Sequence, residues 1–339
     1  MGEVLFLVGP TASGKTAVAL ELAALLSVEV LSLDSMNVYR GMDIGTAKPT
    51  AAQRRGVPHH LIDLVDPNES FSVGRYVTEA RRVMAEVSGR GRLPLFAGGT
   101  ALYLKAMTSG LFEGPSADWE LRATLHERAE SEGTPALHEE LRRLDPVSAG
   151  TIHPNDLKRI VRALEVFHKT GRAVSELRTE WANPKTDPHV LIAGIARDRH
   201  ELYRRIETRV DEMFAAGLVD EVRGLAAKFG TLGREASQAV GYKEVLHHLA
   251  GEEDLETTVE RVKRNTRRMA KRQLTWFRSF DSIRWFPMGG GTESAAVARA
   301  IVQTFAAELD VRVGRPSERG SEPAHDDSAN ADSVMGKKG

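Results

Sequence analysis

The chain of 339 residues contains no cysteine. This absence excludes disulfides, thiolate nucleophiles and cysteine-based zinc sites. No apolar run approaches the ~18 residues that a membrane-spanning helix requires. The N-terminus also lacks a basic segment followed by a long apolar stretch and a cleavage site, which argues against secretion. We therefore expect a cytoplasmic protein with no membrane partner.

An excess of charge of one sign is missing as well. The 46 Lys and Arg residues balance 47 Asp and Glu residues, which gives a formal net charge of −1. Global charge therefore predicts no anionic partner, although a balanced total can hide a one-sided local distribution. The length is enough for one large or two modest domains with a proper core.

Short apolar runs alternate with segments of helical periodicity in the first third of the chain. Apolar residues recur at helical spacing from Lys15 to about Leu26, and Ser72 is typical of a helix N-cap. Strands that alternate with helices predict a parallel α/β sheet. The expected strands are Val4–Val8, Val28–Leu33, Leu61–Val65, Leu93–Ala97 and, later, Val190–Ile195, with helices at 15–26, 72–88 and 100–108.

The pattern changes between residues 113 and 187, where helical stretches occur without a convincing strand. We expect an all-helical insertion domain here, within an α/β core formed by residues 1–112 and 188–312. Residues 313–339 contain Gly, Pro, Ser, Asp and Lys with almost nothing apolar before Val334, and we expect a disordered tail. The expected helices of the insertion are Trp119–Ser131, Pro135–Leu144, Asp156–Lys169 and Val174–Trp181.

A phosphate-binding motif follows the first strand. Gly9, Gly14, Lys15 and Thr16 fit the Walker A pattern G-x-x-x-x-G-K-[ST] between a strand and a helix. Backbone N–H groups and the helix dipole would hold phosphate oxygens, Lys15 would add charge, and Thr16 would ligate Mg²⁺. An ordinary glycine-rich turn does not require Lys-Thr after its last glycine. We therefore predict a P-loop NTPase-like α/β fold, a parallel sheet flanked by helices.

The motif does not say which molecule carries the phosphate. A kinase would use the loop for ATP, and another enzyme would use it for diphosphate as a leaving group. Both reactions need developing negative charge to be stabilised by N–H groups, Lys and Mg²⁺.

Two further strand ends carry polar side chains. Asp34 follows the second strand, where α/β proteins place their chemistry, and it suits a general base, a Mg²⁺ ligand or a cap of the turn. The long loop from Ser35 to Pro49 is of a length that is usually functional. Thr100 follows Gly98-Gly99, and its hydroxyl suits a helix cap, a site residue, or both.

Basic residues form two clusters. Lys158, Arg159 and Arg162 follow an N-cap at Asn155 or Asp156, and a solvated helix face is the favoured explanation for a charge cluster this short. His59-His60 and His247-His248 show no metal-ligand spacing, and we assign them to the surface or to loops. The larger cluster has no acidic residue within it and consists of Arg261, Lys263, Arg264, Arg267, Arg268, Lys271, Arg272 and Arg278.

The larger cluster has the periodicity of one helix. Val262, Thr266, Met269, Gln273 and Phe277 form a stripe for packing, and the other faces are basic. Charge of one sign on a helix is disfavoured unless a polyanion offsets it. Nucleic-acid contact is therefore favoured over a solvated face.

Taken in order, "GPTASGKT", "DSMNVYRGMDIGTAKP", "GGTALYLKA", "HPNDLKRIVRALE", "AVGYKE" and "KRQLTWFR" resemble the bacterial tRNA dimethylallyltransferases, also called tRNA isopentenyltransferases. The resemblance runs from about Val4 to about Phe286. It implies transfer of a dimethylallyl group from dimethylallyl diphosphate to the exocyclic amine of the adenosine at position 37, next to the anticodon of tRNA. Diphosphate leaves with help from Mg²⁺, and the base is flipped into a channel. We expect a monomer whose partners are the tRNA anticodon stem-loop and dimethylallyl diphosphate.

The resemblance also implies roles for particular residues. Asp34 matches the general base and Thr100 a residue that helps hold the adenosine, while Asn37 stands where the family often has Gln. The diphosphate site corresponds to Gly9, Thr11, Ala12, Ser13, Gly14, Lys15, Thr16 and Arg209. The tRNA contacts correspond to Asp34, Ser35, Met36, Asn37, Thr100, Arg122, Lys158, Arg159, Ile160, Val161, Arg162, Gln238, Ala239, Val240, Gly241, Tyr242 and Lys243, to which the basic helix adds Arg264, Arg268 and Lys271.

Two other classes of function remain open from the residues themselves. In a nucleotide or metabolite kinase the insertion would act as a lid and Asp34 would hold Mg²⁺, but the basic helix argues against it. An RNA-binding switch without group transfer is the other, and the long loop after Asp34 argues against that.

Overall fold

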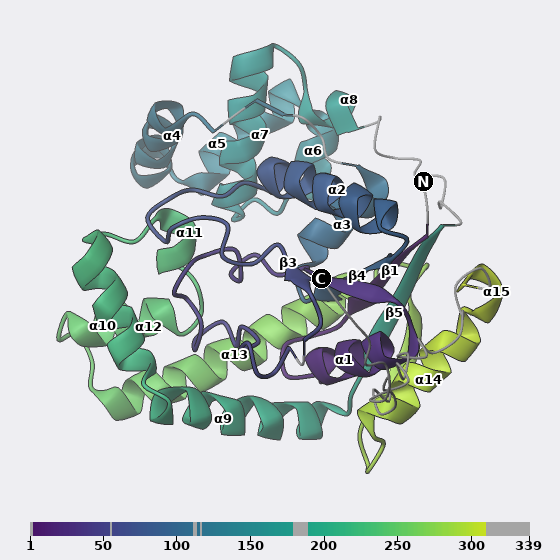
Figure 1. The fold of residues 1–339 in the computed structure, drawn as a ribbon. Coiled ribbons are helices and arrows are strands. Elements are labelled where there is room, and N and C mark those ends of the chain that lie inside the picture. The colour runs from purple at the N-terminus through teal and green to yellow at the C-terminus, as the bar shows by residue number, and fades with distance from the viewer. Residues whose placement is uncertain (1–2, 55, 111–113, 116, 179–188, 310–339) are drawn as a thin grey trace, which may run out of the picture.

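The computed structural model describes residues 3–54, 56–110, 114–115, 117–178 and 189–309. Within this part of the chain, a six-stranded sheet has the order β3-β2-β4-β1-β5-β6, and each neighbouring pair is parallel (Figure 1). This confirms the predicted parallel α/β sheet. The strands are β1 (Val4–Val8), β2 (Val28–Ser32), β3 (His59–His60), β4 (Leu93–Gly98), β5 (Val190–Ala196) and β6 (Arg284–Pro287).

Both faces of the sheet are covered, which explains why the strands are apolar runs and do not alternate with polar residues. In β1, Phe6 faces a core shared with α2 (Val73–Gly89) and α3 (Ala101–Ser109). Its neighbours Leu5 and Leu7 face the opposite core, shared with α1 (Lys15–Leu25), α14 (Ser294–Thr304) and the short α15 (Ala306–Leu309). Ser72 caps α2 as predicted, since its hydroxyl accepts a hydrogen bond from the N–H of Arg75.

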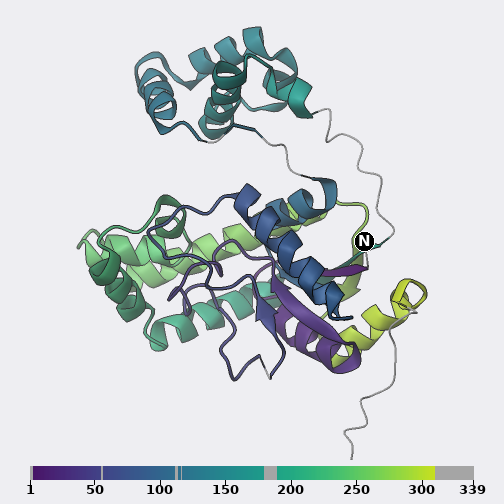
Figure 2. The same ribbon diagram turned by 45° about the horizontal axis from the view of Figure 1, so that its top comes forward.

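The insertion folds around a core of its own (Figure 2). Leu125, Leu137, Leu141, Ile160 and Leu164 are buried in it. The predicted helix to Trp181 is present as far as Arg178, and residues 179–188 lie outside the described part. The helices are α4 (Trp119–Glu132), α5 (Thr134–Leu144), α6 (Pro146–Thr151), α7 (Leu157–Thr170) and α8 (Val174–Arg178).

A second group of helices follows β5. The long helix α13 packs along α9, and Ala270 of α13 lies in one buried cluster with Leu202 and Ile206 of α9 and Ala12 of the glycine loop. This cluster places α13 beside the loop that follows β1. The group consists of α9 (Arg199–Ala215), α10 (Leu218–Phe229), α11 (Arg234–Ser237), α12 (Tyr242–Leu249) and α13 (Leu255–Phe277).

Two expectations about strands were wrong. The predicted strand Leu61–Val65 does not form, because Leu61 and Asp63 have positive φ angles of 60° and 55°, and Val65 makes only an isolated bridge to Tyr39. The edge strand is His59–His60 instead, so these histidines belong to the sheet, and His60 bonds the buried Glu29. The sixth strand, β6, was not predicted, because it is short and begins with a charged residue.

None of the helices in the described residues is both long and apolar enough to cross a membrane. The predicted tail, residues 313–339, lies outside the described part of the chain.

Candidate active site

The order of the strands brings the predicted site residues together. The glycine loop follows β1, Asp34 follows β2, and Thr100 follows β4, which lies between those two strands. All three segments therefore emerge at the carboxyl edge of the sheet, where parallel α/β proteins bind ligands.

Cationic side chains bind the carbonyl groups of the glycine loop. Nζ of Lys15 donates to the carbonyl oxygens of Gly9 (3.0 Å) and Pro10 (2.7 Å). Two arginines outside the motif continue this pattern: Nε of Arg205 donates to Ala12 O (3.0 Å) and Nε of Arg197 to Ser13 O (3.3 Å). Gly14 is the N-cap of α1 and no side chain caps the helix, so its first-turn N–H groups suit an anion.

The pKa of Lys15 depends on charges from two other segments, those of Arg209 and Asp34. The pKa of Lys15 is lowered to about 7, first by burial and then by the positive charge of Arg209, while the charge of Asp34 opposes both effects. Arg209 itself is half-buried on α9, and its pKa is lowered by burial and by Arg205. Lys15 and Arg209 therefore present positive charge to one region, as a diphosphate site requires.

Asp34 lies at the end of β2 in a partly buried position. Its Oδ1 accepts a 2.9 Å hydrogen bond from the N–H of Met36. Burial raises the pKa of Asp34, while the hydrogen bond from Met36 and the charge of Lys15 act in the opposite direction. A carboxylate whose pKa is raised accepts a proton more readily than an exposed one.

Thr100 supports the segment that carries Asp34. It occupies the N-cap position of α3, but its side chain makes no capping bond. Its hydroxyl oxygen instead accepts from the N–H of Ser35 at 3.0 Å. The two strand ends come this close because Gly98 lacks a side chain: a Cβ there would lie 2.2 Å from the carbonyl oxygen of Leu33.

Gln273 was predicted to pack within the helix stripe, and its contact with the site was not predicted. Its Oε1 accepts from the N–H of Thr11 (2.9 Å), and its Nε2 donates to the carbonyl oxygen of Gly99 (2.9 Å). The available signal was one long amide in a stripe otherwise formed by Val262, Thr266, Met269 and Phe277.

The long loop after Asp34 is anchored by two groups. The buried Lys48 donates 2.7 Å bonds to Tyr39 O and to carboxylate oxygens of Asp43 and Asp63. On the other side, the carboxylate of Glu221 in α10 accepts from three successive backbone N–H groups, those of Asp43, Ile44 and Gly45.

Glu221 also holds part of another segment that is predicted to contact RNA, Gln238–Lys243. Tyr242 is fully buried, and its hydroxyl donates to Glu221. A Cβ on Gly45 would lie 2.4 Å from the Tyr242 ring. Gln238 and Lys243 are exposed and Ala239 is buried, so the side chains available to RNA are those of Gln238 and Lys243, with Val240 half-buried.

The predicted RNA contacts of the insertion are of two kinds. Lys158 and Arg159 are exposed, whereas Ile160 and Val161 are buried in the core of the insertion. Asp156 caps α7 through a bond from the N–H of Arg159.

Arg122 and Arg162 both bind one buried carboxylate. Arg122 forms two 2.8 Å hydrogen bonds with the oxygens of Glu165, and Arg162 adds another. The guanidinium of Arg122 also lies 4.8 Å from the ring centre of Trp119, which Arg234 of α11 approaches at 4.7 Å. Arg122 therefore holds the insertion together, whatever else it binds.

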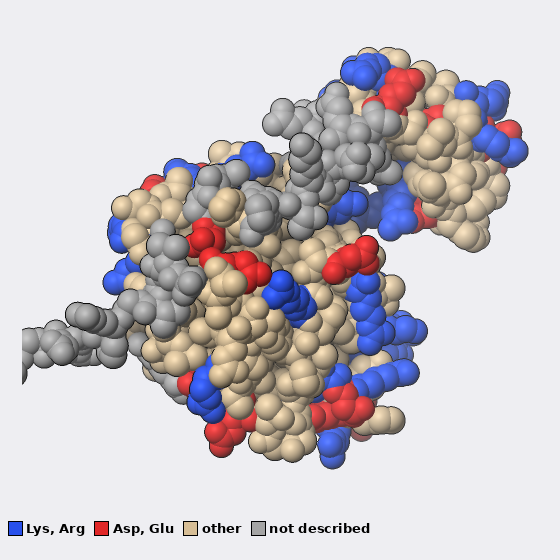
Figure 3. Space-filling view, turned by 90° about the vertical axis from the view of Figure 1, so that its right-hand side faces the viewer, with Lys and Arg blue, Asp and Glu red and all other residues tan. Residues whose placement is uncertain are grey.

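The cations of α13 also divide into two groups. Three of them have acidic partners: Arg261 pairs with Glu253, Lys263 with Asp211 and Arg267 with Glu207. The remainder are exposed and make no ion pair with a described residue: Arg264, Arg268, Lys271, Arg272 and Arg278. Unpaired charge on this helix is thus smaller than the sequence suggested, and it is confined to the outward face. Figure 3 shows Lys and Arg side chains gathered along one edge of the larger body and near its narrow junction with the insertion.

A magnesium ion fits the chemistry of the site. No cluster of three or more His, Asp or Glu side chains suited to a metal is found among the described residues. Mg²⁺ needs no such cluster, since it commonly takes one or two protein oxygens together with substrate phosphate oxygens and water. Thr16 has an exposed hydroxyl in the first turn of α1, and Asp34 supplies a carboxylate within electrostatic range of the same loop.

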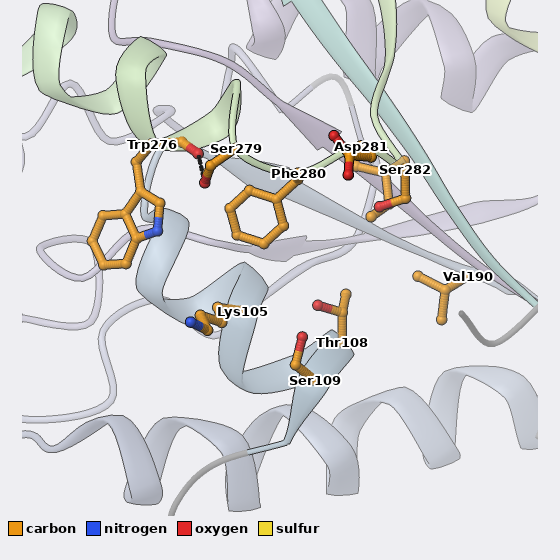
Figure 4. Close-up of a pocket in the computed structure, with 10 residues that line it drawn as sticks. Lys105, Thr108, Ser109, Val190, Trp276, Ser279, Phe280, Asp281 and Ser282 are labelled. Carbon is orange, nitrogen blue, oxygen red and sulfur yellow. Dashed lines mark hydrogen bonds between the residues drawn. The ribbon is translucent and has the colours of Figure 1, made fainter. Parts of the chain in front are cut away.

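A hollow of about 320 Å³ lies apart from this site (Figure 4). Its lining comes from the last two turns of α3, the end of α13, the segment that follows α13, and the start of β5, and includes Lys105, Trp276, Phe280 and Asp281. None of the predicted site residues lines it.

Comparison with known proteins shows the family to which the chain is similar. The chain matches the family model for IPP transferase over residues 37–280 and that for isopentenyl transferase over residues 2–66. A tRNA dimethylallyltransferase of Geobacter sulfurreducens is 49% identical over 283 residues, which make up 84% of this chain and 91% of that protein.

Solved structures are similar as well. The tRNA isopentenylpyrophosphate transferase of Bacillus halodurans is 41% identical with a TM-score of 0.68, and the match covers 92% of this chain and 98% of that one. A eukaryotic dimethylallyltransferase acting on tRNA is 28% identical with a TM-score of 0.76, covering 91% of this chain and 80% of that one. The chain is therefore a transferase built on a P-loop-type parallel sheet. Within that class, the chain belongs to the IPP transferase family.

Proposed function

We propose that this protein transfers a dimethylallyl group from dimethylallyl diphosphate to the exocyclic amine of adenosine 37 in tRNA and releases diphosphate. The observation that carries the proposal is the convergence of a carboxylate, Asp34, with the cationic glycine loop at one edge of the sheet. Asp34 takes the proton of the acceptor, and the glycine loop stabilises the leaving group.

The glycine loop holds the diphosphate of the donor. As the bond between the prenyl carbon and the diphosphate oxygen breaks, its electron pair moves to the diphosphate. The N–H groups that open α1, together with Lys15 and Arg209, stabilise that charge. Mg²⁺ bound by Thr16 and the diphosphate oxygens, with Asp34 nearby, would neutralise part of the same charge.

Asp34 acts as the general base on the acceptor. The exocyclic amine of adenine is a weak nucleophile, because its lone pair is delocalised into the ring. As the carbon–nitrogen bond forms, a proton passes from the amine to the carboxylate of Asp34. Thr100 keeps this segment in place through the N–H of Ser35.

The acceptor reaches Asp34 as a flipped base. Flipping costs a few kcal/mol and is cheapest in a loop such as the anticodon loop. Phosphates on either side of the base are held by the exposed cations of α13 and of the insertion, with Arg264, Arg268 and Lys271 on the first and Lys158 and Arg159 on the second. Since the acceptor is tRNA, we place the reaction in the cytoplasm, and we propose that the protein acts as a monomer.

Mass spectrometry of nucleosides tests this function. Unmodified tRNA incubated with the protein, dimethylallyl diphosphate and Mg²⁺ is expected to gain one C₅H₈ group on the adenosine next to the anticodon. A control tRNA with guanosine at that position is expected to gain none. Modification of both, or of neither, would contradict the proposal.

A further inference from the structure

Gln273 connects the two loops that hold the two substrates. The loop after β1 holds the donor diphosphate, and the loop after β4 leads into Thr100 beside the acceptor. One side-chain amide bonds the N–H of Thr11 in the first loop and the carbonyl oxygen of Gly99 in the second, each at 2.9 Å. Beyond the ladder between β1 and β4, no backbone hydrogen bond of the described residues joins these two loops.

The position of Gln273 is fixed by its helix. Ala270, one turn earlier, is fully buried against Ala12 and α9, and Phe277, one turn later, is fully buried in the core that holds Leu33 and Leu104. The amide is thus anchored on both sides by packing and has little freedom to follow a moving loop.

The second loop is shaped to receive this amide. A Cβ on Gly99 would lie 2.5 Å from Nε2 of Gln273, so a side chain there would displace it. The loops therefore provide both the space for the amide and its two hydrogen-bonding partners. A residue at position 273 that was needed only for packing could equally well be Met or Leu.

We infer that Gln273 is a positioning residue that sets the distance between the donor and acceptor halves of the active site. The inference rests on the proposed prenyl transfer. This role needs no contact between Gln273 and either reacting group. Its bonds hold the phosphate loop and the Thr100 loop in one arrangement, so that the prenyl carbon and the amine meet in line. Losing such alignment lowers turnover more than it lowers the binding of either substrate.

The test is a steady-state comparison of the wild type with Gln273→Met, which keeps the length of the side chain and loses both hydrogen bonds. We expect kcat to fall about 10- to 100-fold, with KM for dimethylallyl diphosphate and Kd for tRNA within about threefold of the wild type. Gln273→Asn carries the same amide on a side chain one methylene shorter, which cannot reach both loops. Its kcat is expected to fall by the same factor. Gln303→Met, at an exposed position on α14, is the matched control and is expected to keep wild-type kinetics.

Rates are measured below the unfolding temperature of the least stable variant. If Gln273→Met does not fold, Gln273→Glu replaces it; its carboxylate would face the carbonyl oxygen of Gly99, and kcat is again expected to fall. A normal kcat in Gln273→Met with a lower Tm would show a purely structural role, and a rise in KM alone would show a diphosphate contact; either overturns the inference. If the wild type itself transfers no prenyl group, the proposed function fails instead.

Discussion

The hydroxyl of Thr100 accepts a hydrogen bond from the backbone N–H of Ser35, the residue directly after Asp34. Thr100 stands at the N-cap of α3 without capping it. The residue therefore serves the neighbouring strand end, and the geometry of the proposed base depends on a side chain 66 positions further along the chain.

Removing this hydroxyl is expected to impair turnover. Thr100→Ala leaves the N–H of Ser35 without its acceptor, and the loss of one such bond corresponds to about 1–3 kcal/mol, or about 5- to 150-fold in kcat/KM. Thr100→Ser keeps the oxygen and should retain most of the activity. Thr108→Ala, at the other end of α3, is the control. Equal activity of Thr100→Ala and Thr100→Ser would show that the bond has no role.

The variant Asp34→Asn distinguishes the role of Asp34 as a general base from a role as a turn cap. The amide oxygen can still accept from Met36, but it cannot take a proton, so turnover should fall by about 10²–10⁴ while tRNA affinity stays close to that of the wild type. A turn cap would lose little turnover.

Thermal unfolding of the same variant gives an independent result. The pKa of Asp34 is raised in the folded state by burial, so the folded protein binds this proton more tightly and wild-type stability falls as the pH rises through that pKa. Asp34→Asn should therefore raise Tm at neutral pH, and the gain should shrink as the pH falls toward about 4. A lower Tm at neutral pH would indicate a structural cap.

Lys15 is expected to limit the capture of the donor at high pH. Its pKa of about 7 means that its charge, and thus part of its affinity for diphosphate, is lost as the pH rises through that value. Bound diphosphate raises the pKa again, so kcat/KM for dimethylallyl diphosphate should decline above about pH 7 while kcat declines only at higher pH. Lys15→Arg keeps its charge and should lose this alkaline decline. If the variant keeps it, another group is responsible.

The salt dependence of RNA binding tests the outward face of α13. Neutralising Arg264, Arg268 and Lys271 should weaken tRNA binding and reduce the slope of log K against log salt by about 2, at about 0.7 per phosphate contact. Neutralising Arg261, Lys263 and Arg267 on the same helix is the matched control, because these cations are paired with acidic residues. Equal slopes for the two triple variants would place the RNA elsewhere.

The parts of the site that follow a local rule could be predicted from the sequence. The glycine loop, Asp34 and Thr100 each follow an apolar strand, and the carboxyl ends of parallel strands share one edge of a sheet. The predicted strand Leu61–Val65 was wrong because Leu61 and Asp63 have positive φ angles, which a strand does not allow, although the segment is largely apolar.

The remaining site residues depend on tertiary packing. Gln273 meets Thr11 across 262 positions, and Arg197 and Arg205 meet the glycine loop across 184 and 193. No local pattern marks such contacts. The pairing of Arg122 and Arg162 with the buried Glu165 likewise depends on tertiary packing, and their RNA contacts stay predictions.

A transfer assay in which only the donor changes tests the central claim, that the loop at Gly9–Thr16 serves a diphosphate leaving group and not ATP. Dimethylallyl diphosphate labelled in the prenyl group is incubated with unmodified tRNA, Mg²⁺ and protein freed of nucleotide, and label in the RNA and released diphosphate are both measured. Equal amounts of labelled tRNA and diphosphate are expected without ATP, and no transfer by the Asp34→Ala protein above about one hundredth of the wild-type rate. Strict dependence on ATP, or ADP as a product, would contradict the central claim.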